Sequence, residues 1–343
     1  MHQLARAVAL GALGLACATG SPDSVLLLDR GLPADAVRAR RVAWKGAGGA
    51  YLADSFQIGG RGEVWVIDKV RVWGVPGAAA SEARTAGDLY ERITLYGGLE
   101  SESQPATSEA AAAVCACHGP VKIASAELGA GGVAEGAQFH LQAVTYPDGS
   151  SFQEGAAPLA IWQVDFQNLR WSVPGGQNVL FGVYADGRAA AERKEKPVWF
   201  NHAETGGGRR RFLAFQTAGN PVVPAAGELP DEESLAINVQ VWGHLTAGVA
   251  IRPAANQWQV ALLGSATLDI SQVDPGSVRF GPRSAAPLSH EEGDSNGDGA
   301  PDLLFRFDGP ESGIPPSGRT ACLWGVRRDG VPFEGCDTTR KAN

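Results

Sequence analysis

The sequence predicts an all-β fold, arranged as two β-sandwich domains behind an export signal. The chain has 343 residues, which is enough for two domains of ordinary size. It contains 45 glycines and 21 prolines, so turn signals recur at short spacing. Amphipathic runs with a helical period are scarce, whereas short apolar runs that alternate with polar residues are common. Together these observations favour strands over helices.

Composition and charge exclude one class of function. The formal net charge is −8, and 44% of the residues are hydrophobic, as in a globular protein. Residues 209–211 form the longest unbroken run of arginines, and such a cluster is more often a solvated edge than a nucleic-acid contact. We therefore expect no nucleic-acid partner. We also expect the protein to be a monomer.

The first 18 residues have the pattern of a secretory signal. Arg6 precedes an apolar run over residues 7–16, which is too short to span a bilayer. The Ala-Cys-Ala sequence at residues 16–18 is an A-x-A cleavage site. Residues 14–17 also resemble a bacterial lipobox, in which Cys17 would carry a lipid and supply the only membrane attachment. Both routes predict a secreted, periplasmic or cell-surface protein in an oxidising compartment.

The first domain is predicted at residues 41–245. A lead-in segment at residues 19–40 precedes it and is expected to contain a first strand at residues 24–28. About ten strands over this length are typical of a jelly-roll-like sandwich. The further strands are expected at residues 50–58, 63–74, 92–96, 139–146, 159–166, 179–184, 198–202, 211–216 and 237–245.

The strand at residues 63–74 alternates in a way that assigns its two faces. One face is predicted to hold Val64, Val66, Asp68, Val70 and Val72. The other is predicted to hold Trp65, Ile67, Lys69, Arg71 and Trp73.

Three segments of this region resemble a known module. Residues 52–56, 65–67 and 162–166 are similar to the "A-D-D-F … W-x-I … V" modules of secreted bacterial proteins. The resemblance covers residues 44–205, and Ser55 stands where the module has its second Asp. It implies the fold and the export of the chain. It implies no chemistry, because these modules have no settled activity.

The strongest chemical signal lies in the second domain, residues 246–343, at the sequence Asp-Ser-Asn-Gly-Asp-Gly-Ala-Pro-Asp over residues 294–302. Oxygen-bearing side chains at positions 1, 3, 5 and 9, with a backbone carbonyl at position 7, are how a short loop surrounds Ca²⁺. Gly299 at position 6 allows a sharp turn. The predicted ligands are Asp294, Asn296, Asp298, Ala300, Asp302 and an upstream acid, Glu291 or Glu292, of which Glu292 completes the set.

The loop is not a complete EF-hand, because Phe305 stands where the bidentate Glu of that motif would be. The apolar residues 303–307 are typical of a strand. The loop therefore resembles the loop-to-strand calcium sites of integrin-like and thrombospondin-like repeats, which implies a structural ion. The alternative is a solvated turn rich in Asp, Asn and Gly. Calcium is favoured because carboxylates packed this closely repel one another without a cation.

Four blocks of the second domain resemble a recurrent C-terminal β-module of secreted bacterial and archaeal proteins. They occur in the same order, at residues 260–265, 269–282, 294–307 and 329–335. The resemblance implies a small immunoglobulin-like β-sandwich with the Asp-rich loop as its cation site. Two departures are a shortened segment before Val260 and a pair of cysteines where the module has small or hydroxyl residues.

The chain has five cysteines, and two of them flank a predicted hairpin. A three-residue turn over residues 328–330, with Gly330 in the left-handed conformation, would place Cys322 opposite Cys336. A two-residue turn would offset them by one position. Residues 115–118, Cys-Ala-Cys-His, have one residue too few for haem attachment, and no second cluster completes a metal site. An exposed loop is the favoured interpretation.

No catalytic motif of comparable strength is present. The sequence has no G-x-S-x-G, no H-E-x-x-H and no phosphate-binding glycine loop. A glycosidase needs two facing carboxylates, and the candidates are Asp54, Asp68, Glu91 and Asp165. A sugar platform could use Trp73, Trp171, Trp199 and Trp258, although tryptophans in sandwiches belong mostly to the core.

The sequence thus favours an exported, non-enzymatic, calcium-binding surface protein. Its expected role is adhesion, or recognition of a cell-surface glycan or protein. The alternative is a secreted carbohydrate-active hydrolase with its site in the first domain. The two differ in whether a cleft in residues 41–245 gathers at least two carboxylates within about 10 Å of each other.

Overall fold

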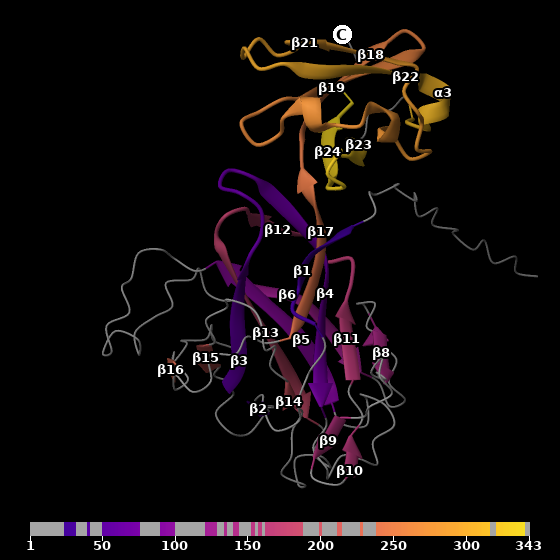
Figure 1. Cartoon of the computed structure of the whole chain (residues 1–343). Helices are drawn as coiled ribbons and strands as arrows, with labels where there is room; N and C mark the ends of the chain where they lie inside the picture. Colours follow the sequence, from indigo (N-terminus) through magenta and orange to yellow (C-terminus); the bar gives the residue numbers. More distant parts are fainter. Residues whose placement is uncertain are drawn as a thin grey trace, which may run out of the picture. The chain divides into compact units, whose positions relative to one another are not determined.

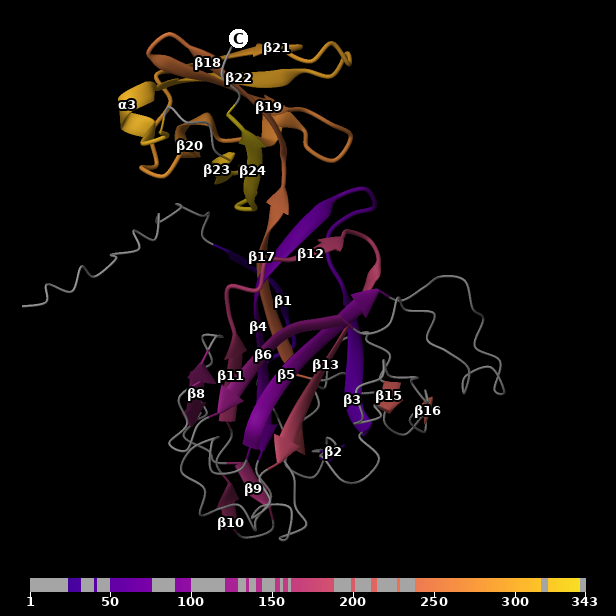
Figure 2. The same cartoon turned by 180° about the vertical axis from the view of Figure 1, so that it is seen from behind.

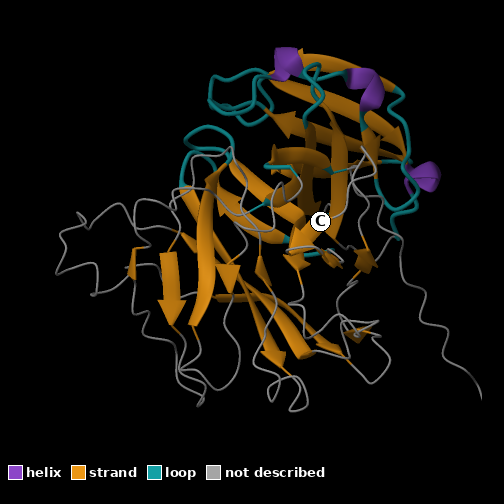
Figure 3. Ribbon diagram, turned by 60° about the horizontal axis from the view of Figure 1, so that its bottom comes forward, coloured by secondary structure: helices purple, strands orange, loops and turns teal. Residues whose placement is uncertain are grey.

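Strands dominate the part of the chain that the computed structural model describes, and the helices there are single turns (Figure 3). The predicted all-β, sandwich-like fold is therefore confirmed. None of the described helices is long and apolar enough to cross a membrane. The described residues are 24–31, 40–41, 50–75, 90–99, 121–128, 134–135, 140–143, 152–154, 157–159, 162–187, 199–200, 211–214, 227–228, 238–315 and 320–339.

Several predictions concern residues outside this set. They are the signal at residues 1–18, with Cys17, and the Cys-Ala-Cys-His segment at residues 115–118. The described residues divide into two units between Thr246 and Ala247. Each unit is built from two antiparallel sheets.

The first sheet of the unit that precedes Ala247 is centred on the long strand β4 (Figure 1). Strand β17 pairs with one side of β4, and β1 pairs with β17. Strands β11 and β12 pair with β4 one after the other. The bounds are β1 Val25–Asp29, β2 Arg40–Arg41, β4 Val64–Val75, β8 His140–Ala143, β11 Trp162–Phe166, β12 Trp171–Pro174, β14 Trp199–Phe200 and β17 Val239–Thr246.

The second sheet of this unit has the order β16-β15-β3-β13-β5-β6-β7, and Figure 2 shows it from behind. Strand β13 lies between β3 and β5 and pairs antiparallel with both. Its strands are β3 Ala50–Gln57, β5 Tyr90–Leu99, β6 Val121–Leu128, β7 Ala134–Glu135, β13 Asn178–Gly187, β15 Arg211–Ala214 and β16 Gly227–Glu228, and a separate pair consists of β9 Phe152–Glu154 and β10 Ala157–Leu159. Strands β6 and β12 were not expected from the sequence.

Aromatic side chains from both sheets meet between them. The ring of Phe56 on β3 lies 5.6 Å from that of Phe181 and 6.4 Å from that of Trp171 on β12. Gly97 on β5 lies under Trp171, and a Cβ at Gly97 would stand 2.4 Å from that indole. The close approach of the two sheets at this point therefore requires glycine.

The predicted faces of β4 are wrong beyond Ile67, because the strand contains a bulge. Trp242 of β17 pairs with Lys69, but the next residue, Gly243, pairs with Ile67, so no residue of β17 stands directly opposite Asp68 in the ladder. Ile67 and Val70 are consequently both buried. An extra residue in one strand reverses the alternation that follows it. A period of two read along the sequence cannot detect this shift.

The unit that follows Thr246 also consists of two sheets. One has the order β18-β19-β22-β21, and the other contains β24, β23 and β20. Phe280 and Phe307, one from each sheet, have ring centroids 5.0 Å apart and are fully buried. Its elements are β18 Gly248–Ala254, β19 Gln257–Leu263, η3 Ile270–Gln272, η4 Pro275–Ser277, β20 Arg279–Phe280, β21 Ser289–Gly293, β22 Asp302–Asp308, α3 Gly309–Ser312, β23 Thr320–Val326 and β24 Pro332–Thr338.

We predict that Gly97→Ala destabilises the protein by about 1–3 kcal/mol, because the new methyl group must displace the Trp171 ring. Urea unfolding monitored by circular dichroism measures the change. Gly293→Ala is the control, since a Cβ at Gly293 meets no atom within 4 Å. Equal midpoints for Gly97→Ala and the parent protein would contradict this account of the sheet contact.

Candidate functional site

The predicted calcium loop connects β21 to β22. The two strands pair antiparallel, with Gly293 opposite Asp302, so residues 294–301 form the tip of a hairpin. The predicted strand after the loop is confirmed as β22, Asp302–Asp308. The arrangement is therefore loop-to-strand and not helix–loop–helix.

Asp294 organises the first half of the loop. Its Oδ1 accepts a hydrogen bond of 2.7 Å from the amide of Gly297, and its Oδ2 accepts one of 3.1 Å from the amide of Gly299. Gly297 and Gly299 have φ values of 79° and 87°, in the left-handed region. The two glycines allow the turns that wrap the chain around this carboxylate.

The second half of the loop repeats a shorter pattern. Asn296 Oδ1 accepts from the amide of Asp298 at 3.0 Å, and Asp298 Oδ1 accepts from the amide of Ala300 at 2.8 Å. The side-chain Nδ2 of Asn296 also donates to Asp298 Oδ2. Hydrogen bonds from the Ala300 amide and from Asn296 lower the pKa of Asp298. The loop thus holds this carboxylate in its ionised form.

Asp302 fastens the loop to the sheet. Its side chain is fully buried, and its two oxygens accept 2.8 Å hydrogen bonds from the amides of Gly264 and Ser295. Gly264 follows β19, and a Cβ there would stand 2.0 Å from the carbonyl oxygen of Pro301. A single carboxylate therefore joins the end of β19, the start of the loop and the start of β22.

The register of β21 separates the two candidates for the upstream ligand. Glu292 is opposite Leu303, and Glu291 is opposite Leu304. Directly opposed residues share a face, and successive residues alternate. Glu291 therefore lies on the same face as Asp302, and Glu292 lies on the other face. Glu291 also forms an exposed ion pair of 3.3 Å with Arg306.

The acids of the loop do not gather around one point in this structure. Over the described residues, one group of three His, Cys, Asp or Glu side chains has ligand atoms that all lie within 4.8 Å of one another. Its members are Cys322, Glu334 and Cys336. Asp294, Asn296 and Asp298 instead accept hydrogen bonds from backbone amides of their own loop, and the calcium site stays a prediction.

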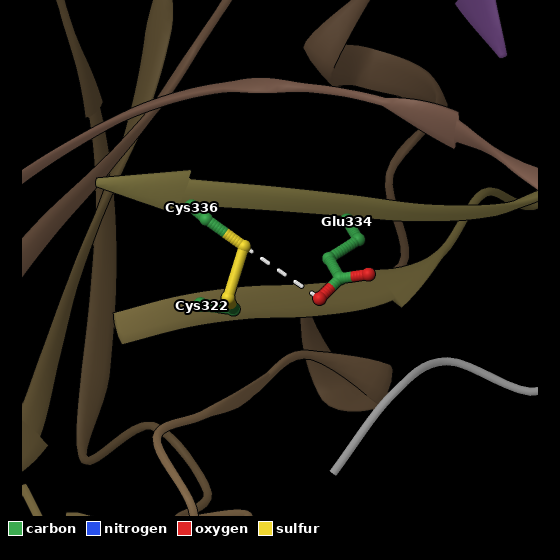
Figure 4. Close-up of side chains that lie close together, drawn as sticks. All are labelled: Cys322, Glu334 and Cys336. Carbon is green, nitrogen blue, oxygen red and sulfur yellow. Dashed lines mark hydrogen bonds between the residues drawn. A yellow bond between two sulfur atoms is a disulfide. The ribbon is translucent and has the colours of Figure 1, made fainter. Parts of the chain in front are cut away.

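The hairpin of β23 and β24 places Cys322 opposite Cys336 and joins them in a disulfide (Figure 4). Arg327 donates its amide to the carbonyl of Val331, and Gly330 has a φ of 87°. The three-residue turn and the predicted register are therefore confirmed. Glu334, which the sequence did not single out, lies with its Oε1 3.6 Å from Sγ of Cys336.

In the other unit, Asp165 on β11 is buried among cations. Arg71 on β4 donates to both of its oxygens, at 2.6 and 2.9 Å, and Lys69 lies 3.0 Å from Oδ2. Burial would raise the pKa of Asp165, but the hydrogen bonds and charges of Arg71 and Lys69 lower it overall. Both cations also lie over the ring of Trp242. Nζ of Lys69 is 4.4 Å from the ring centroid, and Cζ of Arg71 is 5.0 Å from it.

Asp68, at the bulge in β4, has a separate set of partners. Its Oδ2 accepts a hydrogen bond of 2.6 Å from Ser24 and lies 2.7 Å from Nδ1 of the buried His244. Burial would raise the pKa of Asp68, but hydrogen bonds from His244 and Ser24, with the charges of His244 and Arg170, lower it overall. Ser24 and His244 share one carboxylate oxygen, so they do not form a serine–histidine relay.

These environments do not favour glycosidase chemistry at either carboxylate. A general acid needs a raised pKa, and the pKa of both Asp68 and Asp165 is lowered. The side chains of the other two candidates, Asp54 and Glu91, lie outside the described residues.

The tryptophans proposed as a sugar platform do not form one among the described side chains. Trp73 is buried, and Trp171 packs between the sheets against Phe56. Trp258 belongs to the other unit and packs against Phe280. The side chain of Trp199 lies outside the described residues.

No protein-family model matches this sequence, and no curated protein matches it.

We predict that Asp165→Asn destabilises the protein by about 1.5–3 kcal/mol, because Arg71 and Lys69 lose a buried, hydrogen-bonded counter-ion. The measurement is the free energy of unfolding in urea. The control is Glu311→Gln, because Glu311 is exposed and lies outside this network, so the change should alter stability by less than about 0.5 kcal/mol. A small effect at Asp165 would show that the ion pairs contribute little.

Stability should also fall in acid, because the half-buried Asp68 and the buried Asp165 both have a lowered pKa. Their contribution is complete above the unfolded-state pKa of about 3.9 and is lost as pH falls through the lower folded-state values. The double variant Asp68→Asn, Asp165→Asn should therefore lose less stability than the parent between about pH 5 and pH 2. Urea unfolding at several pH values tests this, and parallel pH profiles would contradict it.

Proposed function

We propose that this chain is an exported calcium-binding surface protein that acts in adhesion or recognition and not in catalysis. The observation that carries the proposal is the hairpin loop of residues 294–302, whose oxygen-bearing side chains are held by backbone amides of the loop. Hard oxygen donors at this spacing suit Ca²⁺.

The donor set would consist of side-chain oxygens and one carbonyl. Each carboxylate oxygen that accepts one backbone hydrogen bond keeps further lone pairs for a cation. Bound calcium would supply positive charge among these acids and tie the loop to β22 through Asp302. The proposed ligands are Asp294, Asn296, Asp298, the carbonyl of Ala300, Asp302 and Glu292, with Glu291 as the alternative that shares the face of Asp302.

The unit that precedes Ala247 would bind the glycan or protein that is recognised. A continuous row of hydrogen-bonded polar side chains crosses four neighbouring strands of this unit, in the order β1, β17, β4 and β11. Gln240 donates to Asp29, Arg71 donates to Gln240, and Arg71 is bound to Asp165. Side chains fixed in this way can present donors and acceptors to a glycan or a protein at little entropic cost. They also neutralise one another, which favours binding over acid–base chemistry.

Export is part of the same proposal. The apolar run of residues 7–16 and the A-x-A site support a cleaved signal, and a lipid on Cys17 is the alternative. The disulfide between Cys322 and Cys336 is of the kind that persists in an oxidising compartment. The resemblance to modules of secreted bacterial proteins agrees with this location.

We predict that calcium raises the melting temperature of the protein, because an ion that binds the folded state alone stabilises it. The gain is about 2.7 kcal/mol at a concentration one hundred times the dissociation constant. Asp294→Asn should abolish the shift. The measurement is thermal melting with calcium and with chelator, together with calcium titration calorimetry.

The control is Glu311→Gln, an exposed acid of α3 outside the loop, which should retain the full shift. Glu291→Gln and Glu292→Gln, compared side by side, identify the upstream ligand, because only the true ligand should weaken affinity. No calcium uptake by the parent protein would overturn the proposal. A glycan array run with and without calcium then tests the recognition role.

A further inference from the structure

The hairpin of β23 and β24 brings three potential metal ligands together. Cys322 and Cys336 are directly opposed, and Glu334 precedes Cys336 by two residues, so all three share one face of the hairpin. Their ligand atoms lie within 4.8 Å of one another. Figure 4 shows the three side chains side by side on the two strands. Glu334 is buried, and Cys336 is exposed.

We propose that the reduced form of this hairpin binds a borderline-soft divalent cation, represented by Zn²⁺. The ligands are Sγ of Cys322, Sγ of Cys336 and Oε1 of Glu334. Two thiolates with one carboxylate form a donor set that Zn²⁺ accepts in four-coordinate sites. With three protein ligands, the fourth position is left to water.

The distance between sulfur and carboxylate already fits such a site. For Zn–S near 2.3 Å and Zn–O near 2.1 Å, two ligands at the tetrahedral angle lie about 3.6 Å apart. The separation of Cys336 Sγ and Glu334 Oε1 is 3.6 Å. This contact is not a hydrogen bond in the oxidised protein, because a disulfide sulfur carries no hydrogen.

The two sulfurs must move apart when the disulfide opens. A covalent bond joins them in the disulfide, whereas two thiolates on one tetrahedral ion lie about 3.8 Å apart. The Cα atoms of the pair are 4.0 Å apart. Rotation of the exposed Cys336 side chain about its Cα–Cβ bond is the movement required.

The redox step needs a dithiol reductant, which we name by class. One thiolate of the reductant attacks a sulfur of the Cys322–Cys336 bond and forms a mixed disulfide, and its second thiol then releases the remaining cysteine. The reductant leaves as a disulfide, and the hairpin gains two electrons and two protons. Zn²⁺ then replaces the two thiol protons. Reoxidation of the thiolates by a disulfide releases the ion.

Electrostatics favours a cation in the reduced hairpin. Metal-bound thiolates and a carboxylate are all anionic, so a divalent ion between them is attracted to each of its three ligands. The donors are sulfur-rich, so this site selects a different class of ion from the all-oxygen loop of residues 294–302.

The test uses the full chain with Cys17, Cys115 and Cys117 replaced by Ser, so that the hairpin cysteines are the only thiols. The protein is reduced with a phosphine and titrated with Zn²⁺ in a calorimeter. One equivalent should bind to the reduced protein, and none at this site to the oxidised protein. Zinc should also slow alkylation of both cysteines by iodoacetamide at least tenfold, as peptide mass spectrometry measures. Failure of uptake or of protection would overturn the proposal.

Glu334→Gln should weaken zinc binding at least tenfold, whereas Asp329→Asn in the turn of the same hairpin should leave it unchanged. Equal affinity for Glu334→Gln and the parent would remove the carboxylate from the site. Binding that survives replacement of Cys322 and Cys336 by Ser would sink the proposal. If circular dichroism shows that the Glu334 variant does not fold, the protection of Cys322 and Cys336 from alkylation by zinc, measured with Glu334 intact, decides whether the hairpin binds zinc.

Discussion

Strand register is the constraint on which every site in this protein depends. Side chains alternate along a strand, so a shift of one residue moves each of them to the other face of its sheet. The three-residue turn at Gly330 places Cys322 and Cys336 opposite each other, where a disulfide can form. The pairing of β21 with β22 likewise decides that Glu291, and not Glu292, shares a face with Asp302.

Register also decides how buried charge is compensated. Asp165 is opposite Arg71 in the pairing of β11 with β4, so the carboxylate meets a bidentate guanidinium instead of an apolar neighbour. Asp302 forms no ion pair with the described residues, and its two oxygens instead accept hydrogen bonds from the backbone amides of Gly264 and Ser295. A buried carboxylate without such partners would cost several kcal/mol. These acids are therefore parts of the folded scaffold before they are parts of any site.

Local features of the sequence were sufficient for some predictions. The all-β class, the strand β22 and the turn at Gly330 follow from residues close together in the chain, and all three are confirmed. The bulge at Asp68 could not be predicted, because it is defined by the partner strand β17, about 170 residues away. The same reason hid the partners of Asp165. Glu334 is different, because it precedes Cys336 by two residues on one strand, and the alternation of side chains could have placed it beside the cysteines.

The unit that follows Thr246 places two chemically different donor sets on two hairpins. The loop between β21 and β22 offers only oxygen, which suits a hard cation, and the β23–β24 hairpin offers sulfur with one carboxylate. Oxidation removes the second set by joining its sulfurs and leaves the first set untouched. Calcium affinity should therefore be independent of redox state, whereas affinity for a softer ion should follow it. The calcium proposal and the zinc proposal can be tested independently, because the two sites have no ligand in common.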